Sequence, residues 1–338
     1  MMGAMQILEA GKWLSAESVE RPFVRHRNPG LSPGQLSRFS REHGEILLSV
    51  VIPTLDGCRN GYLNQLLDQV WRQESSSFEI LVTRGDPRQG RAINIAAALA
   101  RGRYLLTLDD DTALPDPLTF AKLIRVMEND PDIGMAGGNN LIPQDATRFV
   151  RRVMRELPRR SWPMVEEITD SDLAEHPCLM MRTMEFKAVG GENELIPRGL
   201  DPYLRMAFRS FGKRVVLVPG VVYHHLPPDR WRRLLSQCFR NGRQAAFTNR
   251  HFPQWVVETP NHHGPFKAQV CWATRFCRFP LRLSSALLAM KPVFFLSELA
   301  YAAGYLTEVV GKRRVAEALL SVDPKDPKPP AGIQPLVA

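Results

Sequence analysis

Residues 91–112 read RAINIAAALARGRYLLTLDDDT, and this stretch decides the fold. Its first half places Ile93, Ala96 and Ala97 at the spacing of one helical face. The short apolar run at 104–108 follows as a strand, and three consecutive aspartates come directly after it. A helix that leads into such a strand is typical of a parallel sheet, whose ligands bind beyond the carboxyl ends of its strands.

The flanking segments repeat this alternation of strands and helices. ILLSVVIP at 46–53 is a continuous apolar run rich in β-branched residues, which suits a strand buried on both faces. A helix is predicted over 63–71 and a second strand over 78–82. Further elements are predicted downstream: a helix that follows the prolines at 115 and 117, a short edge strand at 134–139, a strand at 177–182, a helix at 200–212, and a strand at 213–225 broken at Pro219 and Gly220. The pattern predicts an α/β fold with a Rossmann-like, mostly parallel sheet flanked by helices.

The three aspartates invite two interpretations. On an extended segment Asp109 and Asp111 lie on the same side, where two carboxylates can hold a hard divalent cation such as Mg²⁺ or Mn²⁺. Such ions commonly share their ligands with substrate phosphates. The alternative is that one aspartate caps the following helix and the others are solvated. Both interpretations stay open on the residues alone.

Three segments together resemble the family 2 glycosyltransferases. They are LLSVVIPTLDGCRNGYLNQLLDQVWRQ at 47–73, the stretch 91–112, and CLMMRTMEFKAVGGENELIPRGLDPYLRMAFRSFGKRVVLVPGVVYHH at 178–225. The similarity runs from about Leu47 to about His225, which is most of the chain. It implies a GT-A fold, a nucleotide-diphosphate-sugar donor, a transferase of class EC 2.4, and usually inversion at the anomeric carbon.

The resemblance also assigns roles to residues of this chain. It implies that Asp109 and Asp111 bind Mn²⁺ or Mg²⁺, that His224 or His225 contributes to the metal or diphosphate, and that Asp201 is the general base. The residues implied at the nucleotide sugar are Pro53, Thr54, Leu55, Asp56, Asp86, Arg91, Asp109 and Asp110.

The sequence departs from the family pattern in two places. Where the family has an Asp-Asp-Gly-Ser-like stretch, this chain reads LVTRGDPRQG at 81–90, so Asp86 is the only acid there. The family's Glu-Asp pair reads Leu200-Asp201. Without the resemblance, Asp201 would be interpreted as a helix N-cap followed by Pro202 at the first helical position, a role compatible with that of a base.

The C-terminal third is basic and then apolar. A basic helix is predicted at 229–247, where Arg240 and Arg243 are candidates for the donor diphosphate; a solvated basic face is the alternative. The segment 281–311 is the most apolar of the chain. Basic residues flank it: Arg275, Arg278, Arg282, Lys312, Arg313 and Arg314. An interfacial helical hairpin on an anionic membrane, core helices, and a dimer interface all fit this pattern, and no apolar run is expected to span a bilayer.

Composition sets looser bounds on partners and location. The net charge of +9 permits an anionic partner such as a nucleotide or an acidic lipid surface without selecting one. The five cysteines form no Cys-x-x-Cys, and the first 20 residues lack the apolar core of a signal peptide. These observations predict a reduced, cytoplasmic protein, peripheral at the cytoplasmic face of the membrane.

The sequence therefore predicts four regions: an N-terminal arm at 1–45, a GT-A catalytic domain at 46–226, a basic and amphipathic helical region at 227–322, and a disordered tail at 323–338. The predicted function is metal-dependent, inverting transfer of a sugar to a hydroxyl of a glycan or lipid-linked acceptor, as in polysaccharide biosynthesis.

Two other functions are weighed against this one. A nucleotidyltransferase would share the sheet and the metal, but PTLDGCRNG at 53–61 is a poor version of the Gly-rich phosphate loop that it needs. A non-catalytic basic adaptor for membrane or nucleic acid would leave the aspartates unexplained. No nucleic-acid partner is expected.

Overall fold

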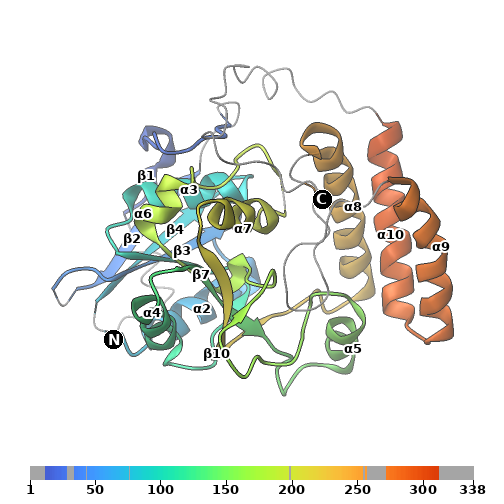
Figure 1. The fold of residues 1–338 in the computed structure, drawn as a ribbon, viewed down its shortest axis with the longest axis horizontal. Helices are drawn as coiled ribbons and strands as arrows, with labels where there is room; N and C mark the ends of the chain where they lie inside the picture. The colour runs from blue at the N-terminus through green and yellow to red at the C-terminus, as the bar shows by residue number, and fades with distance from the viewer. Residues whose placement is uncertain are drawn as a thin grey trace.

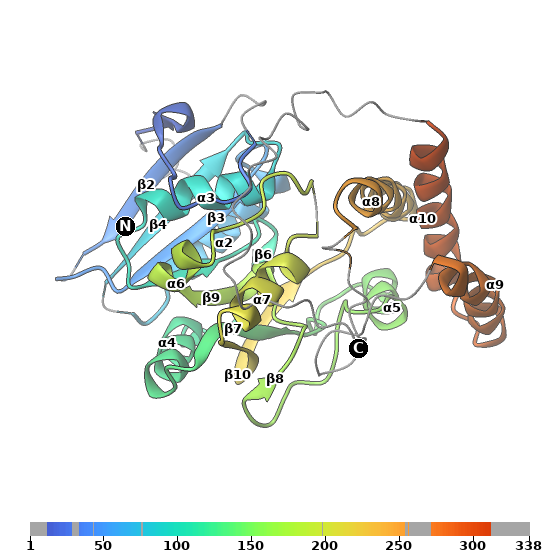
Figure 2. The same ribbon diagram turned by 45° about the horizontal axis from the view of Figure 1, so that its top comes forward.

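The computed structural model describes residues 12–28, 34–42, 44–75, 77–197, 199–253, 256 and 272–311. A central sheet carries helices on both faces, and three C-terminal helices stand together beside it (Figures 1 and 2). The strand order is β1-β2-β4-β3-β5-β9-β7-β10-β6, with β8 paired to β10. This architecture confirms the predicted α/β fold with a C-terminal helical region.

Parallel pairing joins β4, β3 and β5, and again β7 and β10, whereas β9 runs antiparallel between the two groups. The strands are β1 (Leu14–Ser15), β2 (Gln35–Arg41), β3 (Leu48–Thr54), β4 (Phe78–Arg84), β5 (Tyr104–Thr107), β6 (Thr112–Ala113), β7 (Ile133–Asn140), β8 (Thr169–Asp170), β9 (Leu179–Arg182) and β10 (Arg214–His225). The carboxyl ends of β3, β4 and β5 therefore meet at one edge of the sheet.

Helices cover the sheet because its strands present apolar side chains on both faces. Along β3, Val50 and Ile52 belong to the apolar cluster with α2 and α4, and Val51 belongs to the cluster with α3, α6 and α7. The helices are α2 (Tyr62–Trp71), α3 (Gln89–Leu99), α4 (Thr119–Asn129), α5 (Arg148–Glu156), α6 (Thr183–Ala188), α7 (Asp201–Ser210), α8 (Trp231–His251), α9 (Trp272–Leu288) and α10 (Pro292–Val310). The alternation of side chains along a strand explains the two layers.

The structure corrects three details of the predicted fold. Residues 134–139 belong to β7, which lies between β9 and β10 and is not an edge strand. Residues 214–225 form one strand, β10, in which the predicted break is a register shift between Leu217 and Val222. The predicted N-terminal arm contributes a strand to the sheet, because β2 pairs with β4 along its whole length. The predicted tail at 323–338 lies outside the described residues.

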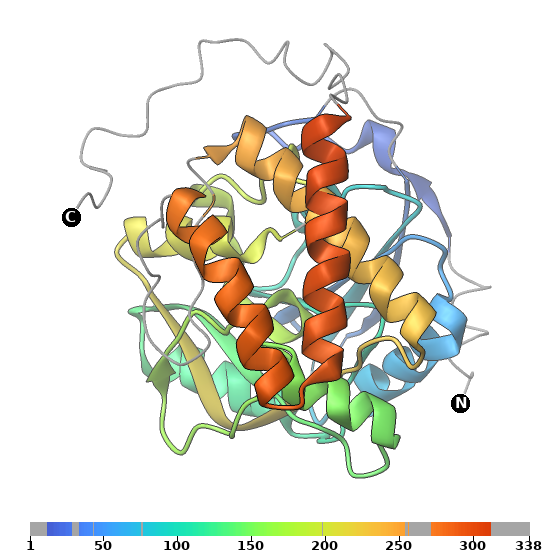
Figure 3. The same cartoon turned by 90° about the vertical axis from the view of Figure 1, so that its right-hand side faces the viewer.

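The helices α8 and α10 touch backbone to backbone. A Cβ added to Gly242 would lie 1.9 Å from the carbonyl oxygen of Tyr301, and one added to Gly304 would lie 2.0 Å from that of Phe239. Beside this contact, Nε and Nη2 of Arg243 each donate to Oε2 of Glu308 at 3.0 Å. Figure 3 shows α8 crossing behind α10 with α9 alongside. The glycines thus fix α10 on α8.

Helix α5 holds the start of α10. The carboxylate of Glu156, at the end of α5, accepts hydrogen bonds from the backbone N–H groups of Val293 and Phe294 at 2.8 and 3.1 Å. These are the donors that a helix N-terminus leaves without an intrahelical partner. The carboxylate therefore caps α10 and joins it to α5.

An apolar face remains exposed on α9 and α10. The exposed apolar side chains are Leu281, Leu287, Leu288, Met290, Leu296, Leu299, Tyr301, Leu306, Val309 and Val310. By length and composition α10 could cross a membrane: it is 19 residues long and apolar, and less than a quarter of its most apolar stretch is buried. The expectation that no segment reaches this length is therefore wrong for α10.

Candidate active site

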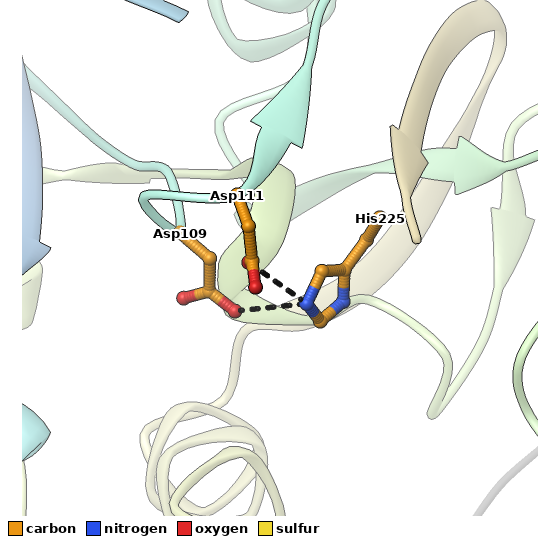
Figure 4. Close-up of side chains that lie close together, drawn as sticks. All are labelled: Asp109, Asp111 and His225. Atoms are coloured by element: carbon orange, nitrogen blue, oxygen red, sulfur yellow. Dashed lines mark ion pairs between the residues drawn. The ribbon is translucent and has the colours of Figure 1, made fainter. Parts of the chain in front are cut away.

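The aspartates follow β5 at the carboxyl edge of the sheet, as predicted. Directly after them β6 pairs antiparallel with the end of β10, which places His225 opposite Thr112. His225 Nε2 lies 3.1 Å from Oδ1 of Asp111 and 3.9 Å from Oδ2 of Asp109 (Figure 4). Ligand atoms of these three residues all lie within 4.8 Å of one another. Two carboxylates and an imidazole suit a hard or borderline divalent cation.

Each aspartate has a further donor. Gln89 Nε2, in the first turn of α3, donates to Oδ1 of Asp109 at 2.8 Å. The hydroxyl of Thr54, at the end of β3, donates to Oδ2 of Asp110 at 2.7 Å. Three loops at the same sheet edge therefore converge on the carboxylates, because strands β3, β4 and β5 all end there.

Arg59 is a site residue that the sequence analysis missed. Its Nη2 lies 2.6 Å and its Nε 3.0 Å from Oδ2 of Asp111. The same Nε lies 3.4 Å from Oδ1 of Asp110. The segment PTLDGCRNG contains this arginine, but nothing in its spacing indicated that the guanidinium turns back over the aspartates.

Burial and neighbouring charges shift the pKa values of the three aspartates in different directions. Burial raises the pKa of Asp109, against the attraction of His225. Burial also raises the pKa of Asp110, to about 6, although Thr54 and Arg59 oppose it. For Asp111 burial acts in the same direction, but His225 and Arg59 outweigh it and hold the pKa below the usual range. Asp111 is therefore the carboxylate most firmly kept as an anion.

The histidine partner is shifted as well. Burial lowers the pKa of His225, but the hydrogen bond and charge of Asp111, with a contribution from Asp109, raise it overall. His224 has a different environment, since alternate residues of a strand face opposite ways. Its Nδ1 lies 2.7 Å from the carbonyl oxygen of Leu141. Of the two predicted histidines, the structure thus brings His225 to the aspartates and leaves His224 outside the cluster.

Asp201 begins α7, and its carboxylate is tied to a neighbouring turn. Oδ1 accepts the backbone N–H of His176 at 2.9 Å, and Oδ2 makes no hydrogen bond among the described residues. Burial would raise the pKa of Asp201, but the charges of His176 and Arg205 and the backbone N–H lower it. Leu200 is the N-cap and Pro202 the second helical residue, so the predicted N-cap role of Asp201 is wrong. Asp201 is an ionised carboxylate with one oxygen uncommitted.

A buried ion pair underlies this region. His176 Nε2 lies 3.0 Å from Oε1 of Glu192, and its Nδ1 lies 3.1 Å from the hydroxyl of Thr107. Burial alone would lower the pKa of His176, but the carboxylates of Glu192, Asp201 and Asp109 raise it to about 9. His176 is therefore an imidazolium at neutral pH whose charge acts on both Asp201 and Asp109. The sequence analysis did not single it out.

The remaining predicted donor residues fall into two groups. Around the β3 end, Pro53 is half-buried, Leu55 is exposed, and Oδ1 of Asp56 accepts the backbone N–H groups of Cys58 and Arg59 at 2.9 and 2.7 Å. These hydrogen bonds lower the pKa of Asp56. They also use two N–H groups that a phosphate-binding loop would need.

The second group makes structural contacts. Arg91 Nε donates to Oδ2 of Asp86 at 2.7 Å, and both side chains are buried. Arg240 donates to Ser236 at 3.0 Å within α8, and Arg243 joins α8 to α10. We therefore do not assign a donor contact to Arg91 or Arg243, whose guanidinium groups serve buried or half-buried ion pairs.

Part of the chain matches a known family. Residues 83–187 match the model of glycosyl transferase family 2, a stretch that runs from β4 to α6 and includes the three aspartates. A search of the curated proteins found no match.

One solved structure shares the fold, and a second is similar to a lower degree. The mannosyltransferase PcManGT from Pyrobaculum calidifontis, solved in complex with GDP-Man and Mn²⁺, superposes with a TM-score of 0.51 at 13% identity, over 81% of this chain and 90% of that one. Residues 1–349 of TarS from S. aureus superpose with a TM-score of 0.42 at 14% identity, over 79% of this chain and 92% of that one. Residues 83–187 are thus similar to the family 2 glycosyltransferases, and the architecture shared with PcManGT shows that the chain has the GT-A fold.

Proposed function

We propose that this protein is an inverting, metal-dependent glycosyltransferase, with Asp109, Asp111 and His225 as metal ligands and Asp201 as the general base. The observation that carries the proposal is the meeting of three ligand atoms within 4.8 Å at the carboxyl edge of the sheet. Their oxygen and nitrogen donors fit Mn²⁺ or Mg²⁺. When bound, the cation offsets the charge that develops on the leaving diphosphate.

Asp201 is suited to take the acceptor's proton. Its lowered pKa keeps it ionised at neutral pH, and Oδ2 is uncommitted. As the acceptor oxygen attacks the anomeric carbon, its proton passes to Asp201 and the bond to the diphosphate breaks, with the electron pair leaving on the phosphate oxygen. A single displacement by an acceptor oxygen inverts the anomeric carbon, which is why one base, without a carboxylate nucleophile, supports inversion.

The buried His176–Glu192 pair supports the role of Asp201 as the base. The backbone N–H of His176 donates to Asp201, and the imidazolium of the same residue adds a positive charge nearby, so the carboxylate is oriented and kept anionic. The side chains of His176 and Glu192 are both buried. They are positioning residues in this proposal.

The nucleotidyltransferase alternative is less well supported. Its phosphate loop would need free backbone N–H groups after β3, but Asp56 already accepts those of Cys58 and Arg59. A non-catalytic adaptor would not need an aspartate cluster at the sheet edge. The family match in this region favours sugar transfer.

The test is a donor screen that needs no acceptor. We expect one nucleotide-diphosphate sugar to raise the melting temperature in the presence of Mn²⁺ and to be hydrolysed slowly. GDP-mannose is the first to try, because PcManGT binds it with Mn²⁺. Asp111→Asn should lose both effects, whereas Asp145→Asn, which removes an exposed carboxylate elsewhere, should keep them. Equal Mn²⁺ dependence in both variants would refute the metal assignment.

We further propose that the enzyme is peripheral at an anionic, cytoplasmic membrane surface, which docks the exposed apolar face of α9 and α10. Charge complementarity supports this partner: Arg278, Arg282 and Lys291 lie on the same two helices or in the turn between them. Apolar insertion together with basic residues is the usual combination for interfacial binding. Because α10 is held by α8 and α5, the face would be presented as a rigid surface.

Vesicle sedimentation distinguishes this docking from self-association. Wild-type protein should sediment with vesicles containing phosphatidylglycerol more than with neutral vesicles. Replacing the exposed pair Leu288 and Met290 by glutamine should release it. If the wild type stays in solution with both vesicles and the double variant converts a dimer to a monomer, the face is a subunit interface and the membrane proposal is wrong.

A further inference from the structure

Arg59 contacts Asp111, one of the two carboxylates that would bind a metal in the proposed site. Its Nη2 and Nε both contact Oδ2 of Asp111, at 2.6 and 3.0 Å, and Nε also lies 3.4 Å from Asp110. His225 lies against the other oxygen of Asp111 at 3.1 Å. Both oxygens of one metal ligand are therefore in contact with cationic or potentially cationic groups. About half of the Arg59 side chain is exposed, so it has space in which to move.

The backbone that delivers Arg59 is unusual. Arg59 and Asn60 have positive φ values of +50° and +57°, a region that non-glycine residues seldom adopt. The turn is held by Oδ1 of Asp56, which accepts the N–H groups of Cys58 and Arg59. Residues kept in such conformations cluster at ligand clamps and switches. The strained turn thus places the guanidinium of Arg59 against the aspartates.

Electrostatics makes this arginine a competitor of the metal. A divalent cation coordinated by Asp111 would lie within a few ångströms of the guanidinium, and two positive groups at that separation repel strongly in a partly buried site. The attraction that lowers the pKa of Asp111 comes partly from Arg59. Metal binding and the Arg59–Asp111 contact therefore oppose each other.

We propose that Arg59 is a cation switch: it leaves Asp111 when the metal binds and turns to the donor's diphosphate. This inference rests on the proposed metal site. The planar fork of arginine, now closed on carboxylate oxygens, matches phosphate oxygens equally well. Exchange of one anion for the other makes metal and diphosphate bind cooperatively, because each relieves the repulsion that the other would meet. The switch would discourage metal binding without a donor.

The experiment measures Mn²⁺ affinity by electron paramagnetic resonance, with and without inorganic pyrophosphate as a probe that carries no base or sugar. A protein-free titration corrects for Mn²⁺ bound by pyrophosphate itself. Arg59→Gln should bind Mn²⁺ alone about 10-fold more tightly than the wild type, a factor typical of coupled sites. Arg72→Gln removes an exposed arginine just beyond α2 and should behave as the wild type.

Pyrophosphate should tighten Mn²⁺ binding in the wild type, and this coupling should be smaller in Arg59→Gln, where the attraction between Mn²⁺ and pyrophosphate remains but the release of Arg59 no longer contributes. Arg59→Lys keeps the charge without the fork and should bind Mn²⁺ alone with intermediate affinity, which keeps the test valid if the glutamine variant misfolds. If wild type and both variants bind Mn²⁺ alone equally, the switch is refuted while the metal site stands. If no protein binds Mn²⁺ even with pyrophosphate, the metal site and the switch fall together.

Discussion

Replacing Glu192 by glutamine should remove much of the pH dependence of stability above neutral pH. Glutamine keeps the size of Glu192 but not its charge, and Glu192 is the strongest of the groups that raise the pKa of buried His176. In the folded wild type this pKa is about 9, against 6.5 in the unfolded chain. Protonation of His176 therefore favours the folded state.

The sign and size of the contribution of His176 to the free energy of unfolding follow from the difference between its folded and unfolded pKa values. A raised pKa contributes stability that is fully present below the unfolded value of 6.5 and is lost as the pH rises through the folded value of about 9. About 2.5 units at about 1.36 kcal/mol per unit give a contribution on the order of 3 kcal/mol. Without the charge of Glu192 the pKa of His176 should fall, and about half or more of this pH-dependent loss should disappear.

Urea unfolding at about pH 6, 7.5 and 9, in buffer with a metal chelator, measures the effect. The wild type should lose stability across this range, and Glu192→Gln should lose much less. Glu194→Gln is the matched control, because Glu194 is equally buried but pairs with Arg21, which does not titrate there. Parallel stability curves for the wild type and Glu192→Gln would refute the assigned charge of His176.

Three further predictions test the site and its support. Asp201→Asn should keep near-normal donor and Mn²⁺ binding but lose transfer by about 10²–10⁴-fold, measured with any active acceptor; an unchanged rate would refute the base assignment. Asp109→Asn should abolish Mn²⁺-dependent donor binding without lowering the melting temperature of the metal-free protein, since burial already disfavours the charge of Asp109; a large destabilisation would contradict this account. Gly304→Ala should cost about 1–3 kcal/mol in urea unfolding, because its Cβ would lie 2.0 Å from Phe239 O; an unchanged midpoint would mean that α8 and α10 separate readily.

The sequence predicted the parts of the fold that follow from local pattern. The apolar runs at β3, β4 and β5 and the helical spacing between them were sufficient to predict the parallel sheet, because each element carries its own periodicity. Position in the sheet carries no such signal. β7 was expected at an edge because GMAGGN is short of large apolar residues, yet it is buried between β9 and β10.

The candidate site also contains some residues that the sequence could indicate and others that it could not. Asp109, Asp111 and Asp201 could be proposed from their places in segments that resemble a family, and His225 as one of two neighbours. Arg59 and His176 could not, because their roles depend on how a strained turn and a buried ion pair fold back in space. Arg91 was a candidate through the resemblance and Arg243 because arginines suit phosphates, but neither ground reveals whether the charge is already paired.

The pairing of β6 with the end of β10 has a consequence for the order in which the protein becomes active during synthesis. The aspartates leave the ribosome more than a hundred residues before His225. A nascent chain can form the β3–β4–β5 layer early, but the third member of the cluster arrives only when the last residue of β10 is made and docks on β6. The proposed metal site would thus be complete only after the last strand of the sheet has docked. A fragment that ends before residue 225 would contain the aspartates without the histidine.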